Sequence, residues 1–378
     1  MFKKTPSQND QLLWIDVLRG LSAYAVVLFH MRVDLWVGWN SIHRAPEQFS
    51  VWDRAIALLS LPMPLMGSTV MMFFLLSGFC IHWPYAGGNK TLDLKPYFIR
   101  RFFRIYPSYL VIILISLLSE WLARILIGQP MSSVSKFAES LLMIQNYGLH
   151  PGQLISNPSL WSLPIEMELY LAYPVFWYLV KNVNIRFALT TAAIVSIGSF
   201  LFLICAQQQW LSFNFTKFWF MWCLGAYLAE SLKKSQLPKW RSWFWSVASL
   251  SVLAASFLTF RNIGVDFCHY FWALSYFLLF LWCLHHKEKL LFLNERFLRG
   301  LIFLGVISYS LYLIHFPFFR LCGAIWIKCF GGKPSDLLVP FAFSGVCVFV
   351  AFVFYRLIEK PSHECGRQLA ARLGKGSQ

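Results

Sequence analysis

Apolar stretches of about twenty residues recur along the 378-residue chain, and they limit what it can fold into. A helix that crosses a bilayer needs about 20 mostly apolar residues, whereas the strands of a membrane barrel alternate over about 10. The sequence therefore predicts an all-α integral membrane protein with about ten transmembrane helices. The predicted spans are 12–33, 63–83, 105–127, 161–181, 185–206, 212–232, 241–260, 267–285, 301–325 and 337–358.

Composition excludes the main alternatives. Hydrophobic residues make up 58% of the chain and charged residues only 13%, whereas soluble domains contain about 25% charged residues. A soluble multidomain protein, a disordered chain and a nucleic-acid-binding protein are all excluded on this ground, despite the net charge of +16. The nine Cys residues include no C-x-x-C pair, and His and carboxylate residues fall at helical ligand spacing only by chance, so we expect no disulfide framework and no metal site.

The distribution of basic residues predicts the topology. With the N-terminus in the cytoplasm, about two thirds of the 33 Lys and Arg residues fall in cytoplasmic segments, as the positive-inside rule requires. Both termini are then cytoplasmic, and 359–378 forms a short cytoplasmic tail. The span 12–33 contains charges and lacks a small-residue cleavage site, so we expect it to be retained. Residues 1–378 are expected to form a single transmembrane domain.

The first span contains Asp16, Arg19 and His30 before its outer end, and a charged side chain inside a span costs roughly 2.5–3.5 kcal/mol. Arg19 and His30 are eleven residues apart, so on a helix they face the same way, about 16 Å apart along the axis. Asp16 precedes Arg19 by one turn and can pair with it. The alternatives are an ion pair that only assists insertion and an interfacial histidine bonded to the backbone.

Three further clusters break the apolar pattern. Arg101 and Arg104 lie one turn apart in R-R-F-F-R-I-Y-P at 100–107, as a fork for phosphate oxygens or as an ordinary cytoplasmic anchor. Pro164 suits a first helical turn in the segment 157–170, where a carboxylate is stabilised by the helix dipole. That segment places Ser162, Glu166 and Tyr170 on one face, as a site or as a cap with interfacial aromatics.

The segment 308–317 contains a polar stripe in an otherwise apolar helix. Tyr309, Tyr312 and His315 follow at three-residue spacing, and Pro317 should bend the helix. A polar stripe that faced lipid would be costly, so we expect it to face the bundle interior, as part of a site or in hydrogen bonds between helices.

Six motifs, in order along the chain, together resemble the membrane acyltransferase-3 family, the polytopic O-acyltransferases of bacterial surface polysaccharides. They are I-D-V-L-R-G at 15–20 with Arg19-x10-His30, F-F-L-L-S-G-F at 73–79, R-R-F-F-R-I-Y-P at 100–107, W-S-L-x-x-E at 161–166, S-Y-x-x-Y-L-x-H-x-P at 308–317 and E-K-P at 359–361. The resemblance covers roughly residues 11–361. The position after Glu166, often acidic in the family, is Met167, and Glu168 follows, so the choice between the two carboxylates stays open.

The resemblance implies a membrane enzyme of the bacterial inner membrane, in the family's single-domain form. Its donor would be an acyl-coenzyme A, most often acetyl-CoA, held from the cytoplasmic side by Arg101 and Arg104 with Arg19 deeper. It would have no permanently bound cofactor. The acceptor would be a sugar hydroxyl of an envelope glycan, such as O-antigen or exopolysaccharide, or of a lipid-linked sugar.

The predicted mechanism makes His30 the general base for the attacking hydroxyl, with a covalent acyl-histidine as the variant. Glu166 would orient His30 or the acceptor, and Tyr309 or Tyr312 could donate to the oxyanion. Further pocket candidates are Asp16, Ser77, Trp161, Tyr170 and His315. Two other functions compete with this one: a transporter or flippase of a lipid-linked sugar, which would also need intramembrane charges, and a scaffold without catalysis.

Overall fold

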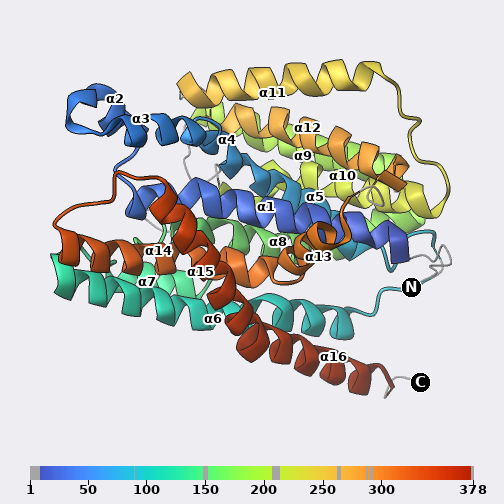
Figure 1. Ribbon diagram of the computed structural model, residues 1–378. Coiled ribbons are helices and arrows are strands. Elements are labelled where there is room, and N and C mark those ends of the chain that lie inside the picture. Colours follow the sequence, from blue (N-terminus) through green and yellow to red (C-terminus); the bar gives the residue numbers. More distant parts are fainter. Residues whose placement is uncertain are drawn as a thin grey trace. The chain divides into compact units, whose positions relative to one another are not determined.

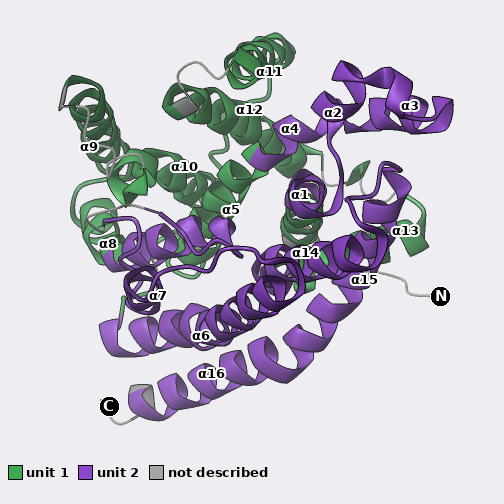
Figure 2. Cartoon of the chain, turned by 90° about the vertical axis from the view of Figure 1, so that its left-hand side faces the viewer, with its two compact units in different colours: residues 1–24, 68–92, 172–308 green, residues 25–67, 93–171, 309–378 purple. Residues whose placement is uncertain are grey.

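The computed structural model describes residues 9–88, 90–147, 152–206, 213–261, 265–286, 288–289 and 293–375. In these residues the regular structure is helical and includes no strand. The chain divides into two compact units, shown in Figure 2: residues 1–24, 68–92 and 172–308 form unit 1, and residues 25–67, 93–171 and 309–378 form unit 2. The helices α1 (Asn9–Leu35) and α8 (Ser162–Asn182) contribute to both.

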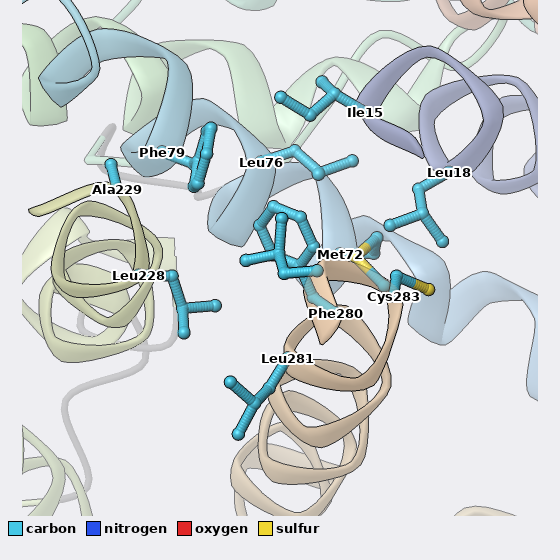
Figure 3. Close-up of a cluster of buried hydrophobic side chains, with 11 residues drawn as sticks. Ile15, Leu18, Met72, Leu76, Phe79, Leu228, Ala229, Phe280, Leu281 and Cys283 are labelled. Atoms are coloured by element: carbon cyan, nitrogen blue, oxygen red, sulfur yellow. The ribbon is translucent and has the colours of Figure 1, made fainter. Parts of the chain in front are cut away.

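Unit 1 combines the first part of α1 and the end of α8 with six further helices. These are α5 (Val70–His82), α9 (Ile185–Ala206), α10 (Phe215–Lys233), α11 (Trp243–Arg261), α12 (Val265–His285) and α13 (Glu295–Val306). Buried apolar side chains of α1, α5, α10 and α12 meet in one cluster, among them Leu18, Leu76, Leu228 and Phe280 (Figure 3). This cluster is one apolar core of unit 1, and a smaller one forms around Val17 and Leu301.

Two pairs of glycines let the helices of unit 1 touch through their backbones. A Cβ atom at Gly78 of α5 would lie 1.9 Å from the carbonyl oxygen of Trp222, and one at Gly225 of α10 would lie 1.9 Å from that of Leu75. Small residues at such contacts allow the close approach that stabilises helix pairs in membranes. The glycine of the F-F-L-L-S-G-F motif is therefore a packing residue. Its neighbour Ser77 accepts a hydrogen bond from the Trp222 indole at 3.2 Å.

The same arrangement joins α1 to α13. A Cβ at Gly20 would lie 2.4 Å from the carbonyl oxygen of Leu301, and one at Gly305 would lie 2.1 Å from that of Asp16. The glycine that ends the I-D-V-L-R-G motif thus lies in a second close helix contact.

Unit 2 is built on long helices with short ones between them (Figure 1). The long helices are α6 (Leu94–Ile127), α14 (Ser308–Phe330), α15 (Leu338–Phe354) and α16 (Lys360–Lys375), with a π-helical turn at Tyr355–Glu359 between the last two. The short helices are α2 (Trp39–Arg44), α3 (Val51–Ala57), α4 (Met63–Met66) and α7 (Val134–Leu141). In both views α16 runs alongside α6, and the two helices are packed together.

The predicted all-α membrane class is confirmed, since eight helical stretches among the described residues are long and apolar enough to cross a membrane. The predicted spans 161–181 and 212–232 correspond to α8 and α10, which are not among these eight. Both contain acidic and basic residues that lower their apolarity. The number of ten stays a prediction. The cytoplasmic placement of the termini also stays a prediction; residues 1–8 and 376–378 lie outside the described residues.

One predicted boundary was wrong. The span 301–325 is interrupted at Ile307, where α13 ends and α14 begins. The segment predicted as a short tail, 359–378, stays a prediction as to its side of the membrane, and it contains a helix that the sequence did not indicate, α16. One face of α16 packs on α6: a Cβ at Gly366 would lie 2.5 Å from the Cβ of Phe103. Apolar periodicity misses such a helix, since a partner far away in the sequence supplies its buried face.

The close contact of α5 with α10 makes a testable prediction. We expect Gly78→Ala to lower the free energy of unfolding in detergent by about 2 kcal/mol or more, because the added methyl group has no space. Gly198→Ala in α9 is the matched control, since no atom lies within 4 Å of its added Cβ and alanine favours the helix. Thermal melts of both purified variants give the comparison, and wild-type stability in Gly78→Ala would contradict the packing described.

Candidate active site

The helix α1 carries both members of the predicted Arg-x10-His pair. It is unbroken over 27 residues, so Arg19 and His30 share one face of the helix. Within unit 1, Arg19 Nη2 donates to the sulfur of Cys80 at 3.4 Å. Asp16 lies within electrostatic reach of Arg19, but the described residues show no ion pair between them. Direct pairing of these two side chains is therefore not seen.

The His30 imidazole is enclosed by rings in unit 2. Its centroid lies 5.2 Å from that of His315, 4.7 Å from Phe316 and 4.6 Å from Phe29. The His30 ring as a whole is half-buried. Its Nδ1 is fully shielded from solvent and has no hydrogen-bond partner among the described residues. The other nitrogen, Nε2, is therefore the one left to face a bound molecule.

His315 is completely buried in α14. Its Nδ1 lies 3.2 Å from the carbonyl oxygen of Leu311, one turn earlier. Because a carbonyl oxygen only accepts, Nδ1 carries the proton and Nε2 carries the lone pair. That Nε2 is also buried without a partner in the described part of the chain. The structure thus brings together two of the predicted site residues, His30 and His315.

The tyrosines of the 308–317 motif connect α14 to other parts of unit 2. The Tyr312 hydroxyl donates to the carbonyl oxygen of Ser159 at 2.7 Å and contacts the Ser162 hydroxyl at 2.7 Å. The Tyr309 hydroxyl donates to the carbonyl oxygen of Ile105 at 2.9 Å. Both phenolic protons are therefore given to backbone carbonyls, which leaves neither free to donate to an oxyanion in this conformation.

Proline residues inside α6, α8 and α14 determine how these helices are held. A proline has no N–H, so the carbonyl four residues before it loses its helical hydrogen bond. In the interior of a membrane no water replaces that donor, and the carbonyl needs another partner. The carbonyls affected belong to Phe103, Tyr170 and Leu313, which precede the three prolines by four residues.

Each of these carbonyls is bonded by a side chain from a distant part of unit 2. Ser362 Oγ donates to the Phe103 carbonyl at 2.6 Å, and the Tyr97 hydroxyl donates to the Tyr170 carbonyl at 3.0 Å. Asn157 Nδ2 donates to the Leu313 carbonyl at 3.0 Å. The last bond attaches the N-P-S-L-W-S-L-P segment to α14, two residues before His315.

Arg104 has a partner that the sequence analysis did not foresee. Its Nη1 donates to Glu359 Oε1 at 2.8 Å, and the Glu359 side chain is 1% exposed. The other oxygen of Glu359 accepts from both the backbone N–H and the hydroxyl of Ser310, in the first turn of α14. A carboxylate at this end of a helix satisfies its free N–H groups. The glutamate of E-K-P thus joins α6, α14 and the π-helical turn.

Arg101 packs against aromatic rings and, unlike Arg104, is not paired with a carboxylate among the described residues. Its guanidinium lies over the rings of Tyr97 and Tyr170, at 5.6 and 5.7 Å from their centroids. Its Nε is buried without a hydrogen-bond partner, and no carboxylate among the described residues pairs with it. The Tyr170 hydroxyl donates to Glu166 Oε1 at 2.5 Å, which links the predicted carboxylate to this arginine through one aromatic ring.

The loop before α8 is held by a buried carboxylate that sequence reasoning missed. Glu120 of α6 is completely buried and accepts four hydrogen bonds, from the N–H and the hydroxyl of both Ser132 and Ser156. Trp161, a predicted pocket residue, contributes its carbonyl oxygen to Asn146 at 2.9 Å. Glu168 interacts with Tyr147 of the same loop, so Glu166, not Glu168, lies on the side of the arginines.

Several residues of this region carried no usable signal in the sequence. Tyr97, Asn157, Ser310 and Ser362 are common polar residues in or beside apolar segments, and only their partners give them a role. The proline positions were the available signal, since each implies a free carbonyl. Among the residues that the structure describes, no group of three His, Cys, Asp or Glu side chains could hold a metal ion.

Comparison with known protein families tests the resemblance that the six sequence motifs predict. The chain belongs to the acyltransferase-3 family, since the family's profile, an acyltransferase domain, matches residues 12–356. The resemblance predicted from the sequence is thereby confirmed, and it places the chain among the membrane acyltransferases.

Curated proteins match over part of the chain. It is 32% identical over 153 residues to Acyltransferase MdmB of Streptomyces mycarofaciens, which is 38% of this chain and 37% of that protein. It is 30% identical over 175 residues to Peptidoglycan O-acetyltransferase OatA of Listeria monocytogenes, 43% of this chain and 23% of OatA. The matches thus span well under half the length of either relative. No solved structure matches the chain.

A double-mutant cycle tests the carbonyl bonds. Ser362→Ala leaves the Phe103 carbonyl without a donor, and we expect it to cost about 1–3 kcal/mol of unfolding free energy. In a Pro107→Ala background the restored N–H of residue 107 can bond that carbonyl, so the same Ser362→Ala change should cost much less. Denaturation of the four proteins in detergent measures the coupling. Equal costs in the two backgrounds would show that the serine bond does not replace the helical one.

Proposed function

We propose that this protein is an O-acyltransferase that moves an acyl group, with acetyl as the expected one, from cytoplasmic acyl-CoA to a hydroxyl of an envelope glycan. One relative is named as a peptidoglycan O-acetyltransferase, so the proposed acceptor is an envelope glycan. The proposal extends this class to surface polysaccharides such as O-antigen and exopolysaccharide and to their lipid-linked precursors. The proposed location is the bacterial inner membrane. The observation that carries the proposal is the enclosed imidazole of His30, in a chain whose family transfers acyl groups.

The chemistry proposed for His30 needs one free nitrogen and a sheltered position. Imidazole takes up and releases a proton near neutral pH, which suits it to this role. His30 Nε2 takes the proton of the acceptor hydroxyl while the oxygen attacks the thioester carbonyl. The carbon–sulfur bond then breaks, and the imidazolium returns the proton to the departing thiolate. The products are an acyl ester and free coenzyme A.

The donor is proposed to bind through Arg101. Coenzyme A carries phosphates, and an arginine without a carboxylate partner can form charge-assisted hydrogen bonds to them. The two rings beneath Arg101 hold its guanidinium in place. Arg104 is already neutralised by Glu359, so its proposed part in donor binding is secondary. Arg19 keeps its proposed place deeper along the donor path.

The first test uses membranes that contain the wild type or His30→Ala, supplied with labelled acetyl-CoA and a crude envelope glycan fraction. We expect the variant to lose label transfer to glycan while it is expressed normally. His43→Ala is the matched control, because His43 is an exposed histidine that stacks on Trp39. Equal transfer by His30→Ala and wild type would exclude His30 as the general base. If acyl-CoA is neither bound nor consumed with any acceptor, a carrier of lipid-linked sugars becomes the better explanation.

A second test separates the two arginines. Arg101→Gln should raise the KM for acyl-CoA about 10- to 100-fold, the effect of one lost charge-assisted contact, with little change in thermal stability. Arg104→Gln should instead destabilise the fold, because it leaves the Glu359 charge buried and unpaired. Steady-state kinetics and thermal melts of both variants distinguish these effects. An unchanged KM in Arg101→Gln would exclude it from the donor site.

A further inference from the structure

The pair of histidines in unit 2 leaves two shielded nitrogens unexplained. His30 Nδ1 and His315 Nε2 are both fully buried, and neither has a hydrogen-bond partner in the described part of the chain. A buried polar atom without a partner costs about 1–3 kcal/mol, and native proteins contain few of them. Here the two atoms belong to neighbouring rings, whose centroids are 5.2 Å apart, so each is a candidate partner for the other.

The proton positions make the two nitrogens complementary. The bond from His315 Nδ1 to the Leu311 carbonyl at 3.2 Å fixes the proton on Nδ1 and leaves Nε2 as an acceptor. His30 can match it only with its proton on Nδ1. In that tautomer the lone pair of His30 lies on Nε2, the nitrogen that the proposed mechanism uses as the base.

The separation of the rings suits a direct bond. Two imidazoles joined by one N–H···N bond of about 2.9 Å have centroids about 5.2 Å apart. The centroids of His30 and His315 are 5.2 Å apart, with 35° between the ring planes. The terminal torsion of a histidine varies broadly, so a turn of either ring can align the two nitrogens.

The neighbours of His315 hold its turn of α14 in place. Three residues earlier in α14, Tyr312 is bonded to the Ser159 carbonyl and the Ser162 hydroxyl. Two residues earlier, the Leu313 carbonyl accepts from Asn157. On the following residue, the Phe316 ring packs against His30 at 4.7 Å. His315 is therefore held on a helix turn with contacts on several sides, as a group that orients a base must be.

We propose that His315 is a positioning residue for acyl transfer: its Nε2 accepts the Nδ1 proton of His30 and holds His30 in the tautomer whose Nε2 can take the acceptor proton. This inference rests on the proposed function of His30. It assigns His315 no contact with either substrate. The part resembles that of the aspartate in a serine hydrolase, which orients a histidine base and selects its tautomer.

The test measures kcat and KM for acyl-CoA in His315→Leu and His315→Gln, with the full chain in membranes. Leucine packs but cannot accept a hydrogen bond, so we expect kcat to fall about 10²- to 10⁴-fold with KM unchanged. Glutamine offers an acceptor oxygen at a similar reach, and we expect its kcat to lie within about tenfold of wild type. Thermal melts of both should stay close to wild type.

The outcomes are separable. Wild-type kcat in folded His315→Leu, or equal losses in the Leu and Gln variants, would overturn the inference while leaving His30 as the base. Full activity in His30→Ala would overturn the proposed base itself. If His315→Leu does not fold, His315→Met takes its place, as a flexible apolar side chain that also lacks a strong acceptor. The double variant His30→Ala with His315→Leu should be no less active than His30→Ala alone, because residues that act as a unit are not additive.

Discussion

The absence of water from the bilayer interior is the constraint on which unit 2 depends. Every backbone group at membrane depth must be bonded within the protein. Prolines in α6, α8 and α14 each release one carbonyl, and Ser362, Tyr97 and Asn157 each supply the missing donor. These bonds attach α16 to α6, α6 to α8, and the loop before α8 to α14. What would be a defect in a single helix becomes the means by which separate helices are fixed together.

Buried charged side chains in the two units also have partners within the protein. Glu359 neutralises Arg104 and satisfies the start of α14. In unit 1, Glu230 accepts from His82 at 3.0 Å and pairs with Lys234, and the completely buried Lys217 pairs with Asp266. A buried charge that has no partner costs several kcal/mol of stability. Arg101, like Arg19, has no carboxylate partner among the described residues, and it is the residue through which we propose that the donor phosphates bind.

The sequence contained enough to predict the class and the family, and it singled out His30 as a candidate site residue, which stays a prediction. Long apolar runs and the Arg19-x10-His30 spacing are local patterns, and both survive in the structure. The partner of Arg104, 255 residues away, could not be read from any local pattern, nor could the ring contact of His30 with His315. The break at Ile307 and the helix α16 were missed because apolarity continues through the first and is weak in the second. In the sequence, Gly78 and Gly20 were recognised only as members of motifs. The structure shows that each allows two helix backbones to come into contact.

The bond between Ser362 and the carbonyl freed by Pro107 also restricts how this chain can change over generations. If the proline is replaced first, residue 107 regains its own donor, and position 362 becomes free to vary. If the serine is lost first, the chain must pass through an ancestor in which the Phe103 carbonyl has lost its donor. Two positions separated by more than 250 residues therefore have a preferred order of substitution, and the same asymmetry holds for Pro174 with Tyr97 and for Pro317 with Asn157.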